Sequence, residues 1–124
     1  MRTIIAGSRT LGLSSAREAM AECGWTATEV VCGCARGVDV AGEHWATEKA
    51  IPVLRFPADW TRYGRSAGYR RNELMAQNAD ALVAVWDGHS RGTKHMIDIA
   101  RRAGLLVFVY LPDGPTAGLE EQAK

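Results

Sequence analysis

Short runs of apolar and β-branched residues recur along the chain, and polar segments with a different periodicity separate most of them. The apolar runs cover residues 3–6, 29–32, 53–56, 81–86 and 106–110. Runs of this length, bounded by turn-forming residues, are typical of buried strands. The last two runs are apolar on both faces, which is typical of strands in a parallel sheet that helices cover on each side.

Four of the intervening segments place apolar residues at the three- and four-residue spacing of a helix. The first begins at residues 14–15, where Ser15 and Glu18 have the spacing of a capping box. In the third helix we expect Leu74 and Met75 to face inward. The second, third and fourth helices are predicted over about residues 36–50, 68–78 and 90–103.

Five strands that alternate with four helices predict an α/β fold of three layers, in which a doubly wound, mainly parallel sheet lies between helices. We expect one domain over residues 1–111 and a flexible tail over residues 112–124, where Gly and Pro are frequent. Residues 58–67 have no clear periodicity and exceed the 2 to 6 residues usual for such connections. Long loops in compact domains are often functional.

Composition limits the classes of function. The 124 residues carry 15 Lys and Arg against 14 Asp and Glu, so the net charge of +1 supplies no global field for nucleic acid or acidic membranes. The longest apolar run, residues 105–111, is far shorter than the roughly 20 residues of a membrane-spanning helix. The first residues do not resemble a secretory signal, so we expect a cytoplasmic protein without a membrane partner.

Three cysteines, Cys23, Cys32 and Cys34, argue against a disulfide framework in such a protein. The pair at 32 and 34 has no second Cys or His pair at ligand spacing, so we predict no metal site. The remaining possibility is that these thiols are buried or lie in loops.

Charge is nevertheless unevenly distributed. Residues 60–72 contain four arginines and no acidic residue, whereas residues 14–50 contain six acids and three bases. Aromatic residues alternate with these arginines, which suits phosphate pairing combined with base stacking. A solvated basic loop is the alternative. The residues concerned are Trp60, Arg62, Tyr63, Arg65, Tyr69, Arg70 and Arg71.

Three glycine-containing loops follow the predicted strands 1, 2 and 4, at residues 7–10, 33–39 and 87–93. Ligands of open parallel sheets bind outside the carboxyl ends of the strands, near the point where the strand order reverses. Glycine lets the backbone approach a phosphate, and free N–H groups at a helix start can bind it. Each loop alone could be an ordinary turn, but three at one edge favour an anion site.

The presence or absence of other sequence motifs limits the ligands and reactions that we expect. The dinucleotide fingerprint Gly-x-Gly-x-x-Gly and the Walker lysine pattern are both absent from the sequence, which weakens classical NAD-binding and ATP-hydrolysing functions. Asp39 and Glu43 lie four residues apart on one helix face and could assist glycosidic cleavage, or form a solvated surface. The three histidines have no evident Ser or Cys partner, so a catalytic triad is not supported.

Several motifs in order resemble the YspA, cpYpsA-related SLOG family over about residues 1–110. They are Gly7-Ser8-Arg9, residues 34–39 with Glu43, residues 56–60, Arg71-Asn72 and residues 90–96. The resemblance implies a Rossmann-like domain of bacterial or phage type that binds nucleotides or nucleotide-derived ligands. The same superfamily contains the Lonely Guy phosphoribohydrolases, which cleave the N-glycosidic bond of nucleoside monophosphates, and DNA-processing protein A, which binds single-stranded DNA.

The resemblance also assigns roles to single positions. Residues 35–39 and Arg71-Asn72 look like the DNA-binding group, whereas Gly92-Thr93 looks like the phosphate loop of the phosphoribohydrolases. Arg71 matches the catalytic arginine of those hydrolases. However, Met96 stands where they have a glutamate, and a thioether cannot move a proton.

We therefore expect a sensor that binds a nucleotide-like small molecule without a further cofactor, and a homodimer by analogy with relatives. One alternative is N-glycosidic hydrolysis by Arg71, with Glu43 or Glu73 in place of the missing glutamate. A second is binding of single-stranded DNA. The predicted ligand-binding residues are Gly7, Ser8, Arg9, Gly33, Arg36, Gly37, Asp39, Arg71, Asn72, Asp87, Gly88, Ser90, Gly92 and Thr93.

Overall fold

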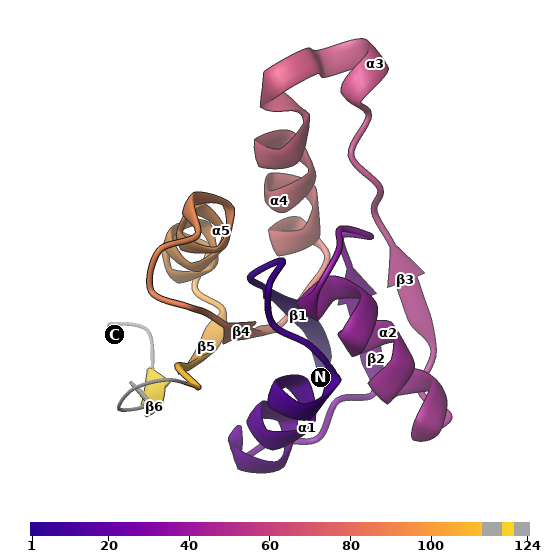
Figure 1. Ribbon diagram of the computed structural model, residues 1–124, viewed down its shortest axis with the longest axis vertical. Helices are drawn as coiled ribbons and strands as arrows, with labels where there is room; N and C mark the ends of the chain where they lie inside the picture. The colour runs from indigo at the N-terminus through magenta and orange to yellow at the C-terminus, as the bar shows by residue number, and fades with distance from the viewer. Residues whose placement is uncertain (113–117, 121–124) are drawn as a thin grey trace.

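The computed structural model describes residues 1–112 and 118–120. It contains one six-stranded sheet with the strand order β3-β2-β1-β4-β5-β6 (Figure 1). The first five strands are parallel to their neighbours, and β6 is antiparallel to β5. The strands are β1 (Arg2–Gly7), β2 (Glu29–Cys32), β3 (Val53–Arg55), β4 (Ala81–Val85), β5 (Leu106–Tyr110) and β6 (Gly118–Glu120).

Helices connect the parallel strands, as the alternating pattern predicts. They are α1 (Leu13–Glu22), α2 (Val38–Glu48), α3 (Trp60–Tyr63), the 3₁₀ turn η1 (Gly64–Ser66), α4 (Ala67–Gln77) and α5 (Arg91–Arg102). The doubly wound, Rossmann-like α/β fold is thereby confirmed, with β6 as a short strand that the periodicity did not predict.

Two hydrophobic clusters hold helices to opposite faces of the sheet. Ile5, Val30 and Val83 pack with Ala19 and Val38, which come from α1 and α2. On the other face, side chains such as those of Ile4, Leu82 and Val107 pack with residues of α4 and α5, Met75 and Met96 among them. Alternation of side chains along each strand supplies both faces, so the sheet is the middle of three layers.

The strand order reverses at β1, because the chain passes from β1 outward to β2 and β3 and then returns to β4 on the other side. Gly7 pairs with Val85 at the end of this central pair of strands. A crevice at such a point is where ligands of open α/β sheets bind. Figure 1 shows the loops after β1 and β2 side by side at this edge.

The predicted capping box at the first helix is wrong. The helix α1 begins at Leu13, and its N-cap residue is Gly12, which has no side chain to accept a hydrogen bond. Ser15 and Glu18 therefore lie inside the helix. The predicted inward position of Leu74 is also wrong, because 46% of its surface is exposed, whereas Met75 is buried as expected.

The segment 58–67 contains regular structure, contrary to the prediction of an irregular loop. Asp59 caps α3 by accepting a hydrogen bond from the Arg62 amide (3.0 Å). Gly64 then has a φ of 55°, where the chain turns into η1 and α4. Figure 1 shows α3 at the far end of α4 from β4, beyond the main body of the sheet.

The tail predicted over residues 112–124 falls mostly outside the described residues. Residues 113–117 and 121–124 are not described, and Gly118–Glu120 between them forms β6, where Leu119 pairs with Phe108. Among the helices in the described part of the chain, none has the length and apolar character needed to cross a membrane.

Candidate functional site

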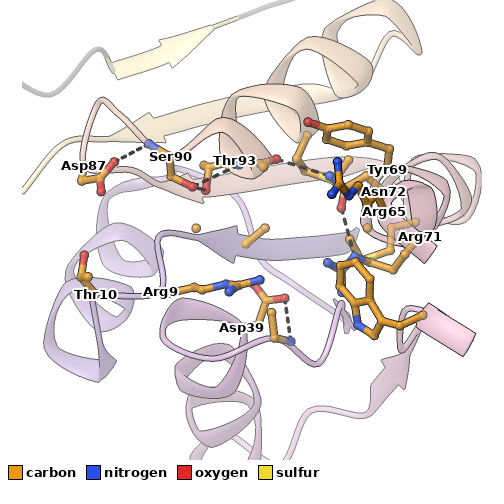
Figure 2. Close-up of a pocket in the computed structure, with 18 residues that line it drawn as sticks. Arg9, Thr10, Asp39, Arg65, Tyr69, Arg71, Asn72, Asp87, Ser90 and Thr93 are labelled. Carbon is orange, nitrogen blue, oxygen red and sulfur yellow. Dashed lines mark hydrogen bonds between the residues drawn. The ribbon is translucent and has the colours of Figure 1, made fainter. Parts of the chain in front are cut away.

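A cavity of about 440 Å³ lies at the carboxyl edge of β1 and β4, where the strand order reverses; it is called the main cavity below. Residues after β1, β2 and β4 line it together with residues of α4 and the α3 region (Figure 2). Nine of the predicted ligand-binding residues contribute to this lining: Gly7, Arg9, Asp39, Arg71, Asn72, Asp87, Ser90, Gly92 and Thr93.

The first loop is held against β4 by the buried residue Ser8, only 1% of which is exposed. Its amide donates to the Val85 carbonyl (3.0 Å), and its Oγ accepts from the Asp87 amide (3.0 Å). Its carbonyl accepts from the Val38 amide (3.3 Å). Ser8 therefore joins the loops after β1, β2 and β4 and does not line the main cavity, although we predicted direct contact with phosphate.

Glycines at two points allow this close approach. A Cβ atom on Gly7 would collide with the Val85 carbonyl oxygen. Gly37 has a φ of 74°, and a Cβ atom there would lie 2.5 Å from the Ser8 carbonyl oxygen. Real Cβ atoms do not approach backbone oxygens this closely, so both positions require glycine. Gly37, like Ser8, does not line the main cavity, but it allows the loops around the cavity to pack closely.

The loop after β4 is ordered by its own side chains. One carboxylate oxygen of Asp87 accepts from the amides of His89 and Ser90, both at 2.8 Å. These two hydrogen bonds, the largest contributions, lower the pKa of Asp87 below its ordinary value. Gly88, with a φ of 87°, makes the turn between them. Asp87 thereby fixes the chain that leads into α5.

Ser90 caps the helix α5, since its Oγ accepts from the Thr93 amide (3.5 Å). The same Oγ lies 3.1 Å from the Thr93 Oγ1. Both hydroxyl groups and Gly92 face the main cavity at the positive end of a 12-residue helix. This end carries unsatisfied N–H groups of the first turn and is suited to an anion.

Asp39 lies across the cavity, in the first turn of α2, and only 5% of its surface is exposed. Its Oδ2 accepts from the Ala35 amide (3.2 Å). Burial, the largest effect, raises its pKa, while the Ala35 amide and the charges of Arg71 and Arg9 oppose the rise. Figure 2 shows the Arg9 side chain extending to the Asp39 carboxylate.

Arg71, on α4, takes part in hydrogen bonds that join two of the loops at the site. Its Nη1 donates to the Gly33 carbonyl, and its Nε donates to Asn72 Oδ1 (3.2 Å). The Nδ2 of Asn72 donates in turn to the Gly92 carbonyl (3.3 Å) and lies 3.1 Å from His95 Nδ1. The predicted pair Arg71-Asn72 thus couples the loop after β2 to the start of α5.

Aromatic side chains form a further wall. Trp60 and Tyr69 line the main cavity and are 54% and 47% exposed. The Tyr69 ring lies 4.2 Å from the His95 ring, centroid to centroid. Arg65 also reaches this wall. The exposure of Trp60 and Tyr69 leaves ring surface free for a planar ligand group.

A second cavity of about 260 Å³, called the side cavity below, adjoins the first. Gly33 and Arg36, two predicted residues that do not line the main cavity, line this one. Arg9, Ala35, Trp60 and Arg71 line both cavities.

Sequence reasoning assigned Trp60, Arg65 and Tyr69 to a basic aromatic segment and did not place them with the phosphate loops. Thr10 and Ala35 lie in two of the predicted loops but were not among the predicted ligand-binding residues, and Gly68 and Met75 were not expected at the site. None of these four residues carries a charge that could have indicated a role in binding. Only the spacing of Gly68 and Met75 from Arg71 on one helix could have indicated them.

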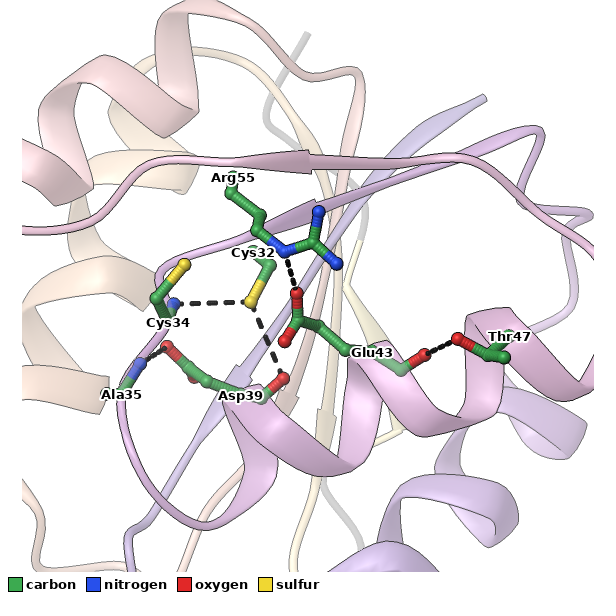
Figure 3. Close-up of polar contacts among 7 residues, drawn as sticks. All are labelled: Cys32, Cys34, Ala35, Asp39, Glu43, Thr47 and Arg55. Carbon is green, nitrogen blue, oxygen red and sulfur yellow. Dashed lines mark hydrogen bonds and ion pairs between the residues drawn. The ribbon is translucent and has the colours of Figure 1, made fainter.

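Of the candidates for glycosidic catalysis, Arg71 and Asp39 line the main cavity, whereas Glu43 and Glu73 do not. The Glu43 carboxylate forms an ion pair with Arg55 on β3, while Asp39, one turn earlier, bonds to the loop after β2 (Figure 3). Glu73 is exposed on α4. Met96, at the position where the phosphoribohydrolases have a glutamate, lines the main cavity and is 1% exposed. Among the described side chains, those of residues 1–112, no cluster of three His, Cys, Asp or Glu residues is arranged to hold a metal ion.

A sequence profile of the YspA, cpYpsA-related SLOG family matches residues 1–63, about half of the chain. The protein belongs to this family. The match covers the loops after β1 and β2 and ends within the segment that carries Trp60. The chain is also 38% identical over 86 residues to the Gene 61 protein of Mycobacterium phage D29, an alignment that spans 64% of this chain and 68% of the phage protein.

Among solved structures, the chain is similar to DNA processing protein A from Streptococcus pneumoniae, with a TM-score of 0.66 and 15% sequence identity. The superposition covers 87% of this chain but 49% of the other, so the SLOG-family chain spans about half the length of that protein. At this level of identity the similarity establishes the shared fold.

Proposed function

We propose that this SLOG-family protein binds a nucleotide or a nucleotide-derived ligand in the main cavity and acts as a sensor of it. One observation carries the proposal: the cavity lies at the reversal point of the sheet and combines the amino-terminal end of α5 with Arg9, Arg65 and Arg71. A helix N-terminus and arginines together bind phosphate, and this position is where nucleotides bind in open α/β sheets.

In the proposed complex, the phosphate lies at the first turn of α5. Gly92 leaves open space for it, because a Cβ atom there would meet no described atom within 4 Å. The Ser90 and Thr93 hydroxyl groups donate to phosphate oxygens from the same turn. Arg71 supplies a positive charge to this phosphate and is linked to the same turn, since it donates to Asn72, which donates to the Gly92 carbonyl.

The nucleoside occupies the rest of the main cavity. The exposed rings of Trp60 and Tyr69 provide stacking surfaces for the base, and such contacts tolerate different bases. Asp39 accepts hydrogen bonds from ribose hydroxyl groups, the role that a carboxylate has in dinucleotide-binding folds. Met96 lines the cavity at the position where the phosphoribohydrolases have a glutamate, and it has no ionisable group. The proposed role is therefore sensing and not hydrolysis.

Isothermal titration calorimetry with nucleoside monophosphates, cyclic nucleotides and ADP-ribose tests this function. We expect saturable binding of at least one ligand with a stoichiometry of one per chain. The substitution Arg71→Gln should weaken it by roughly 10- to 100-fold, the value of a charge-assisted hydrogen bond of about 1.5–3 kcal/mol. Arg62→Gln is the matched control, since Arg62 is exposed on α3 and lines neither cavity.

Absence of binding across the whole set of ligands would contradict the proposal. Equal affinity of the Arg71→Gln and wild-type proteins would contradict the site. Thermal unfolding of both variants establishes that they are folded, and Arg9→Gln provides a second test because Arg9 is exposed and lines the same cavity.

Binding of single-stranded DNA is a second candidate function. It is favoured by the exposed segment α3–α4, where Arg62 and Arg70 both lie over the Tyr63 ring, at 5.1 and 4.4 Å from its centroid. The structural neighbour named DNA processing protein A makes the candidate worth testing. Such binding should fall steeply with salt and should weaken in an Arg62→Gln, Arg70→Gln double variant. Undetectable or salt-independent binding would exclude it.

The proposal includes a cytoplasmic location, where nucleotides are available, and a homodimer, as the family resemblance implies. Light scattering of the purified chain tests the dimer. A monomer at every concentration up to about 100 µM, well above the dissociation constant of a micromolar dimer, would remove that part of the proposal.

A further inference from the structure

The side cavity is lined by positive charge, and one of its cations, Arg36, is not used by the proposed phosphate site. Three arginines line it, Arg9, Arg36 and Arg71, and none of the carboxylates in the described part of the chain contributes to its lining. The rest of the lining is small or apolar, with Gly33 and Ala35 among the contributing residues. A concave surface of this kind is suited to an anion and not to a cation or an apolar group.

Arg36 differs from most other arginines of this half of the protein. Arg17 forms an ion pair with Glu48, and Arg55 forms one with Glu43. Among the side chains of residues 1–112, the Arg36 guanidinium has no carboxylate partner. Its charge is therefore available to a ligand, and it lies in the loop directly before α2, at a cavity wall.

The two cavities adjoin each other and share part of their lining. Arg9 and Arg71 line both, and Arg71 is fixed there by its hydrogen bond to the Gly33 carbonyl. Arg71 therefore faces the proposed phosphate site from one side and the side cavity from the other. One ligand that occupies both cavities would carry two anionic groups, one near α5 and one near Arg36.

We propose that the ligand is of the dinucleotide type: one nucleotide lies in the main cavity, and a second phosphate-bearing unit lies in the side cavity against Arg9, Arg36 and Arg71. The inference rests on the proposed function, because it extends the ligand from the same site. It adds a class of ligand, with two phosphates on separate units, and a residue that selects for it, Arg36.

The chain carries a natural reporter for this cavity. Cys34 is exposed and lines the side cavity but not the main cavity. Cys23 and Cys32 are buried, and burial raises the pKa of the Cys32 thiol to about 12, which disfavours its thiolate. Iodoacetamide should therefore alkylate Cys34 first, and a group bound in the side cavity should slow that reaction.

The experiment compares a nucleoside monophosphate with the 5′-phosphorylated dinucleotide of the same base, for each of the four bases. In calorimetry the dinucleotide should bind at least tenfold more tightly than the best monophosphate. Arg36→Gln should remove this gain and leave monophosphate affinity within twofold of wild type. Arg62→Gln, an exposed arginine outside both cavities, should change neither value.

In parallel, saturating dinucleotide should slow alkylation of Cys34 at least fivefold, whereas saturating monophosphate should slow it less than twofold. Binding of monophosphates with no gain for dinucleotides, or a gain that Arg36→Gln does not reduce, would overturn the inference and leave the proposed function standing. No binding of either ligand would overturn both. Affinity that keeps rising by tenfold or more from dinucleotide to tetranucleotide would also overturn it, because it would indicate a surface for longer strands.

Discussion

At the scale of single residues, the main cavity holds two carboxyl groups in opposite environments. Burial raises the pKa of Asp39, whereas amide hydrogen bonds from His89 and Ser90 lower the pKa of Asp87. Asp87 is committed to its own loop by those bonds. Asp39 is the carboxyl group that can exchange its present hydrogen-bond partner for a ligand. The positive charges of Arg9 and Arg71 compensate its negative charge.

The raised pKa of Asp39 predicts a pH-dependent cost to folding. Below the ordinary value of 3.8, the carboxyl group is protonated in both states and costs nothing. As the pH rises through that value and then through the higher value of the folded protein, the unfolded state ionises first, so stability falls. Relative to wild type, Asp39→Asn should therefore gain thermal stability as the pH rises from 3.5 to 7.

The measurement is the difference in melting temperature between Asp39→Asn and wild type across that range. All other groups are common to the two proteins, so the difference isolates Asp39. A difference that is constant with pH, or that becomes more negative as the pH rises, would contradict the assignment of burial as the dominant effect.

A second residue-scale prediction concerns the cap of α5. Ser90→Ala removes the side chain that accepts from the Thr93 amide, and loss of a helix cap costs about 1 kcal/mol. Urea denaturation should show this loss. Ser14→Ala is the matched control: Ser14 is exposed within α1, so its free energy of unfolding should change by less than about 0.5 kcal/mol. Equal effects of the two substitutions would show that Ser90 does not act as a cap.

At the scale of elements, the site depends on three loops that meet where their strands end. Their convergence was predictable, because parallel strands end at one edge and the glycine-containing loops follow strands 1, 2 and 4 in sequence. Periodicity also predicted the five parallel strands. It missed the true start of α1, since a glycine can occupy an N-cap position without a side-chain signal.

The segment 58–67 shows a second kind of structure that the hydrophobic pattern cannot predict. Its helix is one turn long, too short for a 3.6-residue periodicity to register, although Asp59 and the Arg62 amide cap it in an ordinary way. Trp60 was predicted as part of a basic aromatic segment suited to base stacking, and its ring is exposed. Its place in the cavity wall depends on how α4 is set against the sheet, a tertiary arrangement that local spacing does not encode.

Glycines in these loops provide an element-scale prediction. Gly37→Ala should lower the free energy of unfolding by about 1–3 kcal/mol, because position 37 has a positive φ and its Cβ would contact the Ser8 carbonyl. Gly92→Ala should change it by no more than about 1 kcal/mol, since nothing described lies within 4 Å of the added Cβ. Chemical denaturation measures both. Equal losses would mean that the loops after β1 and β2 do not approach as closely as described.

At the scale of the whole molecule, the near-neutral net charge hides an organised distribution. Acidic residues are frequent in the first half of the chain, and many of them neutralise surface arginines, as Glu43 and Glu48 do. Three arginines, Arg9, Arg36 and Arg71, lie instead near the reversal point of the sheet, where they surround two adjoining cavities. A small domain thereby concentrates positive potential at one edge without an overall basic charge.

The central claim is that a nucleotide binds at this edge, with its phosphate at the first turn of α5. Backbone amide chemical shifts, followed by two-dimensional NMR while the best-binding nucleotide is added, test it most directly. The account predicts saturating shifts at Gly92 and Thr93, in the loop after β1 and at Ala35. Shifts confined to the outer face of α3 and α4, around Arg62 and Arg70, or no shifts at millimolar nucleotide, would contradict it.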